Sequence, residues 1–94
     1  MNLFKAAFLG HYTRVESLIK KGIDINLKQL KGGCTALICA CGEGNVEVVR
    51  LLISHRADPN IGDSTGLTPL QAARRSNNLL VVEEIKEYLT EFVS

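Results

Sequence analysis

The sequence predicts an all-α protein built as a tandem array of helix pairs, and three observations support this fold class. The segment TALICA at residues 35–40 recurs thirty-three positions later as TPLQAA at residues 68–73. Within both copies a leucine and an alanine stand three apart, on one face of a helix. A weaker third copy lies upstream, where Leu3, Ala6, Gly10, His11, Val15, Leu18, Asp24 and Asn26 correspond to Leu37, Ala40, Gly44, Asn45, Val49, Leu52, Asp58 and Asn60. A period of this length indicates stacked units, so we expect function on a surface that the units share.

The first helix of each later copy has a predicted start. Thr35 and Thr68 are N-cap residues, because a threonine hydroxyl can accept a hydrogen bond from a backbone N–H of the first turn. Pro69 suits the first helical position, where its fixed φ fits and its missing N–H costs nothing. Leu70 and Ala73 share the packing face, and the small alanine lets a neighbouring helix approach closely.

The turn between the two helices of each copy favours a left-handed backbone. Gly10 and Gly44 adopt that conformation without strain. The third copy has Asn77 and Asn78 instead, and asparagine tolerates the conformation next best. We therefore expect a tight turn at all three places.

The second helices are predicted from their apolar residues, which are Val15, Leu18 and Ile19; Val46, Val48, Val49, Leu51, Leu52 and Ile53; and Leu79, Val81, Val82, Ile85, Tyr88, Leu89 and Phe92. The middle helix is the most apolar, as expected for a helix flanked on both sides. The last helix carries an acidic face opposite its apolar residues, which predicts a solvated end to the array.

The second copy, TALICACGEGNVEVVRLLISHRADPN, resembles the ankyrin repeat. The resemblance covers nearly the whole chain in three registers. It implies an all-α ankyrin-repeat solenoid of stacked helix-turn-helix units joined by β-hairpin-like loops. We expect residues 1–94 to form a single domain, with a cap-like repeat 1 at about 1–29, repeat 2 at about 30–62 and a cap-like repeat 3 at about 63–94.

The two connecting segments differ from each other and from the family pattern. Residues 27–34 are one residue longer than residues 61–67, and Leu30 stands where the second segment has Asp63. We therefore expect an irregular first loop. Arg56 replaces the glycine that ends the second helix of a repeat, and a non-glycine residue in a left-handed cap costs about 1 kcal/mol or more.

The resemblance also implies a binding surface, because ankyrin arrays bind proteins along a concave face made of loop tips and first helices. Phe8 is the residue we single out, since an exposed aromatic ring supplies contact area at low entropic cost. The alternative is that Phe4, Phe8 and Tyr12, spaced four apart, pack together as a helix stripe. Carried over copy by copy, the partner-binding residues are Phe8, Leu9, Lys28, Lys31, Cys34, Glu43, Ser64, Thr65, Leu67 and Arg75.

Charge changes sign along the chain. Residues 1–31 carry six basic and two acidic side chains, whereas residues 63–94 carry three basic and five acidic ones. The gradient could orient a charged partner, although scattered charge on solvated helices is the simpler explanation. We expect a protein partner that is acidic near the first loop tip. The near-neutral total of +1 disfavours nucleic acid, and no apolar run reaches the roughly 20 residues that span a bilayer.

The cysteines do not form a recognisable chemical site. Cys34, Cys39 and Cys41 are an odd set within eight positions, which does not suit a disulfide framework and favours a reducing compartment, the cytoplasm or the nucleus. Together with His11 and His55 they lack the spacing of a zinc site. We therefore expect no metal, no cofactor and no enzymatic activity.

The sequence thus predicts a non-catalytic protein–protein interaction module. The alternative function is a structural segment of a longer ankyrin array or multidomain protein, stacked on further repeats, and the chain is expected to be a monomer or part of a larger chain. Asn26 and Asn60 lie in a context that resembles the one in which intracellular asparaginyl hydroxylases modify ankyrin repeats. The simpler interpretation is that each asparagine ties down the loop backbone.

Overall fold

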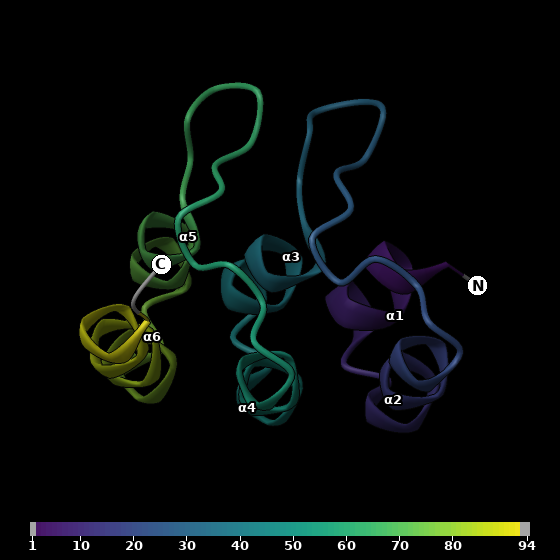
Figure 1. Ribbon diagram of the computed structural model, residues 1–94. Helices are drawn as coiled ribbons and strands as arrows, with labels where there is room; N and C mark the ends of the chain where they lie inside the picture. Colours follow the sequence, from purple (N-terminus) through teal and green to yellow (C-terminus); the bar gives the residue numbers. More distant parts are fainter. Residues whose placement is uncertain (1, 93–94) are drawn as a thin grey trace.

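The computed structural model describes residues 2–92. This part of the chain contains no strand and six helices, which are α1 (Leu3–Leu9), α2 (Tyr12–Lys20), α3 (Ala36–Gly42), α4 (Val46–Ser54), α5 (Pro69–Ser76) and α6 (Leu79–Glu91). Figure 1 shows two layers, with α1, α3 and α5 in one and α2, α4 and α6 in the other. Two long loops, between α2 and α3 and between α4 and α5, project side by side from the first layer. The predicted all-α stack of helix pairs is confirmed.

Each first-layer helix begins at a side-chain cap. The Thr35 hydroxyl accepts a hydrogen bond from the Ile38 N–H at 3.2 Å, and Thr68 accepts one from the Gln71 N–H at 3.3 Å. Gln71 completes a capping box with Thr68, because its side-chain Oε1 accepts a hydrogen bond from the Thr68 N–H at 3.1 Å. Asn2 caps α1 in the same way by accepting from the Lys5 N–H. The two threonine caps are confirmed, and the Asn2 cap is an addition.

The left-handed turn positions are also as predicted. Gly10 and Gly44 have φ of 76° and 70°, and Asn77 has φ of 57°. Arg56 adopts the same left-handed conformation with φ of 64°. Its guanidinium lies 4.8 Å from the centroid of the Phe92 ring, so a cation–π contact offsets part of the expected backbone strain.

The core lies between the two layers and between successive repeats. Leu37 and Leu52 of the middle helix pair are buried completely or nearly so, and Ala40 allows close helix approach. Helix α3 packs against both α1 and α5, while α4 packs against both α2 and α6. The middle pair is therefore flanked on both sides, as its apolar sequence predicted.

The prediction that Leu79 belongs to the apolar stripe of the last helix is wrong, since its side chain is 76% exposed. The buried residues of α6 are Val81, Ile85 and Tyr88. Leu79 and Val81 are two positions apart, which is about 200° around a helix of 3.6 residues per turn. Leu79 consequently lies on the solvent side.

Backbone hydrogen bonds close the two loops and correct their alignment. The Gln29 N–H donates to the Cys34 carbonyl at 2.8 Å, and the Asp63 N–H donates to the Leu67 carbonyl at 2.9 Å. Gln29, not Leu30, is therefore the counterpart of Asp63. The extra residue lies inside the closed loop, where Leu30 is fully exposed.

Asp63 organises the second loop through its side chain. Its Oδ1 accepts hydrogen bonds from the Thr65 N–H, the Thr65 hydroxyl and the Leu67 N–H at 2.7–2.9 Å. The first loop turns instead through two successive left-handed glycines, Gly32 and Gly33. The loops are joined by a bond from the Ser64 N–H to the Gly32 carbonyl at 2.9 Å.

Three asparagine side chains join successive repeats. Asn45 Nδ2 donates to the carbonyls of Ala7 and Phe8, each at 2.9 Å. Asn78 Nδ2 donates to the Gly44 carbonyl at 3.2 Å, and Asn26 Oδ1 accepts from the Asp58 N–H at 2.8 Å. These bonds fix the relative position of neighbouring first helices and loops, and hence the surface that they share.

Candidate protein-binding surface

A hollow of about 400 Å³ runs across the first-layer helices and the bases of both loops. We call it the central groove. It is lined by Phe8, Gln29, Cys34, Ile38, Cys39, Gly42, Glu43, Leu67, Ala72 and Arg75. These residues come from α1, the first loop, α3, the second loop and α5, so the groove exists only because the three repeats are stacked in register.

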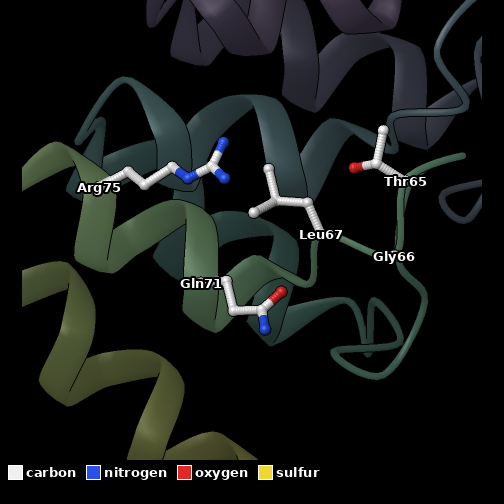
Figure 2. Close-up of a pocket in the computed structure, with 5 residues that line it drawn as sticks. All are labelled: Thr65, Gly66, Leu67, Gln71 and Arg75. Carbon is white, nitrogen blue, oxygen red and sulfur yellow. The ribbon is translucent and has the colours of Figure 1, made fainter.

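A second hollow, of about 330 Å³, adjoins the groove on the side of the second loop and α5. We call it the side pocket, and Figure 2 shows the five residues that line it, Thr65, Gly66, Leu67, Gln71 and Arg75. Leu67 and Arg75 line both hollows and therefore stand between them.

Five of the ten predicted partner-binding residues line the central groove, namely Phe8, Cys34, Glu43, Leu67 and Arg75. Thr65 lines the side pocket. Lys28 and Lys31 line a separate hollow of about 360 Å³ at the first loop, together with Phe4 and Leu30. Leu9 and Ser64 are exposed but line neither the groove nor the side pocket.

Phe8 is not a core residue. Its side chain is 50% exposed, and Tyr12 is 41% exposed, whereas Phe4 is half-buried. The alternative of a packed stripe of these three rings is therefore not what the fold shows. The Phe8 carbonyl is held by Asn45, which fixes the backbone from which the ring reaches the groove.

The sequence interpretation missed Gln29, Ile38, Cys39 and Ala72, which also line the groove. For the residues on α3, the spacing in the sequence could have indicated a shared face. Ile38 and Gly42 are four apart, and Cys39 and Glu43 are four apart, so all four can reach the same side of α3. No sequence spacing indicates that Gln29 lines the groove, because its position depends on how the first loop is aligned.

The groove thiols are protonated at neutral pH. Burial raises the pKa of Cys39 to about 12, with further increases from the neighbouring Cys34 and from Glu43. Burial, with the Asp63 charge, also raises the pKa of Cys34, and burial alone raises that of Cys41. All three thiols are free. A reactive cysteine needs the opposite shift, toward the thiolate.

No group of three histidine, cysteine, aspartate or glutamate side chains within residues 2–92 is placed to hold a metal ion. In the same range, no helix is both long enough and apolar enough to cross a bilayer. The side chains that line the groove offer apolar contact, hydrogen bonding and charge.

Two opposite charges line the groove, Glu43 at the C-cap of α3 and Arg75 on α5. The Asp63 carboxyl lies within the second loop. Its pKa is lowered by its hydrogen bonds to Thr65 and Leu67 and, more weakly, by the positive charge of Arg75. Within residues 2–92 the Arg75 guanidinium has no hydrogen-bond or ion-pair partner. It is thus available to a ligand.

The two asparagines predicted as modification sites differ in their surroundings. Asn26 is half-buried and accepts the inter-repeat bond from Asp58. Asn60 is exposed, and its side chain makes no hydrogen bond within the described part of the chain. Asn26 therefore has the structural role expected of a loop asparagine, and Asn60 is the more accessible of the two.

Comparison with known proteins places these features in a family. A profile for ankyrin repeats matches residues 3–92 in three copies. The chain is 34% identical over 86 residues to the "Ankyrin repeat and KH domain-containing protein mask-1" of Caenorhabditis elegans, covering 92% of this chain and 3% of that protein. It is 33% identical over 87 residues to the mouse "Ankyrin repeat domain-containing protein 40", covering 90% and 24%.

A third relative, the mouse "2-5A-dependent ribonuclease", is 41% identical over 68 residues, which is 72% of this chain and 9% of that protein. The chain thus spans a quarter or less of these three relatives. Ankyrin repeats are in general protein-interaction modules, and the recurring caps, left-handed turns and paired helices described above lie within the matched residues 3–92. The chain belongs to the ankyrin repeat family.

Proposed function

We propose that this chain is a non-catalytic module that binds a partner protein through the central groove and the adjoining loop tips. The observation that carries the proposal is the groove itself, in which side chains from five separate segments meet on one surface. Phe8 and Leu67 provide apolar contact area, and Glu43 and Arg75 provide charge. Such a mixture of an aromatic anchor and an arginine is typical of interface hot spots.

The partner is expected to be acidic where it meets the first loop. Lys28 and Lys31 are exposed there, and the hollow that they line also contains the exposed Leu30. Opposite charge on the partner would accelerate association, and this effect would weaken as salt is added. The three free thiols suit a reducing compartment, so we place the chain in the cytoplasm or the nucleus.

The test is an affinity pull-down from cell extract with the wild-type chain and matched variants. Phe8→Ala and Leu67→Ala remove apolar area from the groove. Leu79→Ala is the control, because Leu79 is more exposed than Phe8 but lies on α6 and outside the groove. The same partners should be lost with Phe8→Ala and Leu67→Ala and kept with Leu79→Ala. If all three variants retain every partner, the binding face has been placed wrongly.

A second candidate function is that of a structural segment stacked on further repeats. It is favoured by the small share of its relatives that the chain covers. Sedimentation velocity separates the two functions. Exposed end faces that need a neighbour predict self-association as concentration rises, whereas a self-sufficient module stays monomeric.

Asparagine hydroxylation stays a prediction, with Asn60 as the better candidate because of its exposure. Intact mass after co-expression with an asparaginyl hydroxylase is the measurement. The expected result is a gain of one oxygen atom that is absent from Asn60→Ala and still present in Asn26→Ala. An unchanged mass of the wild-type chain would remove the prediction.

A further inference from the structure

The side pocket differs in chemistry from the central groove that it adjoins. The groove lining is largely apolar and includes Phe8, Ile38, Cys39, Leu67 and Ala72. The side pocket is lined by Thr65, Gln71 and Arg75 around Leu67 and Gly66 (Figure 2). A ligand that follows the surface from one hollow to the other meets apolar side chains first and polar ones next.

Gln71 and Arg75 in the side pocket have hydrogen-bond donors that have no acceptor within residues 2–92. Gln71 Oε1 is occupied by the Thr68 N–H, so the Gln71 amide NH₂ remains to donate. The Thr65 hydroxyl donates to Asp63 Oδ1, which accepts three hydrogen bonds from its own loop. The Arg75 guanidinium adds five N–H donors with no acceptor within residues 2–92. A group that fits this pocket must therefore accept hydrogen bonds.

The charges around the pocket suit a single negative charge. The Arg75 fork matches a carboxylate and can bind it through two parallel hydrogen bonds. Asp63 is close enough for Arg75 to lower its pKa, and this second charge reduces the local positive potential. A carboxylate, with one negative charge, is consequently a better match than a doubly charged phosphate.

We propose that the central groove and the side pocket bind one segment of the partner protein, in which an apolar side chain contacts Phe8 and Leu67 and a nearby aspartate or glutamate pairs with Arg75 and Gln71. This inference rests on the proposed function and specifies its ligand. Glu43 lies on the groove side and disfavours a second acidic residue there. The segment is therefore apolar at the groove and acidic toward the side pocket.

The experiment selects peptides from a phage-displayed random library on the immobilised chain. Wild type, Arg75→Glu and Arg74→Glu are used in parallel. Arg74→Glu is the matched control, because Arg74 is the exposed neighbour on α5 and lines neither hollow. Circular dichroism melts check that each variant is folded before selection.

Wild type and Arg74→Glu should enrich peptides that combine an apolar residue with an aspartate or glutamate. Arg75→Glu should enrich lysine or arginine at the acidic position instead. For one selected peptide, replacing its glutamate by glutamine should weaken binding to wild type by about tenfold or more in fluorescence polarisation, since a charged hydrogen-bonded pair is lost. The same replacement should change binding to Arg75→Glu little or strengthen it.

The inference and the proposed function fail in different ways. The carboxylate site is wrong if the selected peptides need Phe8 and Leu67 for binding but show no preference for an acidic residue. It is also wrong if Arg75→Glu selects the same sequences as wild type. In both cases the proposal that the groove binds a partner is unaffected. If selected peptides bind Phe8→Ala and Leu67→Ala as tightly as wild type, both are overturned.

Discussion

At the residue scale, the buried thiol of Cys41 makes stability depend on alkaline pH. Burial raises its pKa well above the ordinary 9.0. Above about pH 9 the unfolded chain loses this proton while the folded chain keeps it, so the free energy of unfolding falls by about 1.4 kcal/mol per pH unit. Below that pH both states are protonated, and the contribution is fully present.

The measurement is urea unfolding between about pH 7 and pH 11 for wild type and Cys41→Ala. The variant should lose less stability per pH unit above pH 9, whatever its stability at neutral pH. Cys34→Ala is the comparison, because Cys34 is only half-buried and should change the alkaline slope less. Parallel slopes for wild type and Cys41→Ala would contradict the prediction.

Arg56 combines an unfavourable backbone conformation with a favourable side-chain contact. Replacing it with glycine relieves the left-handed φ but removes the cation–π contact to Phe92. We expect Arg56→Gly to be more stabilising in a Phe92→Leu background than in the wild type, by a coupling of about 0.5–1 kcal/mol. A double-mutant cycle of unfolding free energies measures this coupling. Additive effects within about 0.3 kcal/mol would mean that the ring and the guanidinium do not interact.

At the scale of elements, Asn45 ties α4 to the end of α1. Its side chain donates to the carbonyls of Ala7 and Phe8 at the C-terminus of α1, where carbonyls lack the regular helical partner four residues on. The Ala7 carbonyl also accepts from the Gly10 N–H at 3.3 Å. Asn45→Ala should therefore lower the free energy of unfolding by about 1–3 kcal/mol. It should also weaken any ligand that depends on Phe8.

Asn60→Ala is the matched control for Asn45→Ala. Asn60 is exposed and makes no side-chain hydrogen bond within residues 2–92, so its replacement should change stability by less than about 0.5 kcal/mol. Chemical denaturation of both variants decides the matter. Equal losses from the two replacements would show that the inter-repeat hydrogen bonds are not what Asn45 contributes.

The elements show which features the sequence could predict. Helix starts at Thr35 and Thr68 and left-handed turns at Gly10 and Asn77 were predictable, because each depends on hydrogen bonds or torsions within three or four residues. The loop alignment was not. Counting back from Thr35 and Thr68 aligns Leu30 with Asp63, whereas the hydrogen bonds that close the loops align Gln29 with Asp63. The sequence does not show where in the first loop the extra residue lies, because that depends on how the loop closes.

At the scale of the whole molecule, stability rests on the stacking of each pair on its neighbours. For 94 residues the total free energy of unfolding should be about 5–14 kcal/mol. Leu52 of the middle pair is fully buried, and Leu52→Ala should cost about 2–5 kcal/mol. That loss is a large part of the total free energy of unfolding, so we expect unfolding at a much lower urea concentration than in the wild type. Circular dichroism and tyrosine fluorescence should report the same midpoint.

Leu79→Ala supplies the control for Leu52→Ala. The side chain of Leu79 is 76% exposed, so the same chemical change should shift stability by less than about 0.5 kcal/mol. A small loss from Leu52→Ala, matching that from Leu79→Ala, would mean that the middle pair does not hold the array together.

The sequence by itself determined the repeat frame. Caps, turns and apolar spacing are local, and their recurrence fixed the number and order of the helix pairs. The resemblance to the ankyrin repeat then implied that Phe8, Cys34, Glu43, Leu67 and Arg75 belong to the binding surface. The tertiary structure alone decided that these five share one groove, that Cys39 and Gln29 join them, and that Arg75 also lines the side pocket. The physical reason is that the groove forms between repeats, where side chains far apart in the chain meet only after the helices stack.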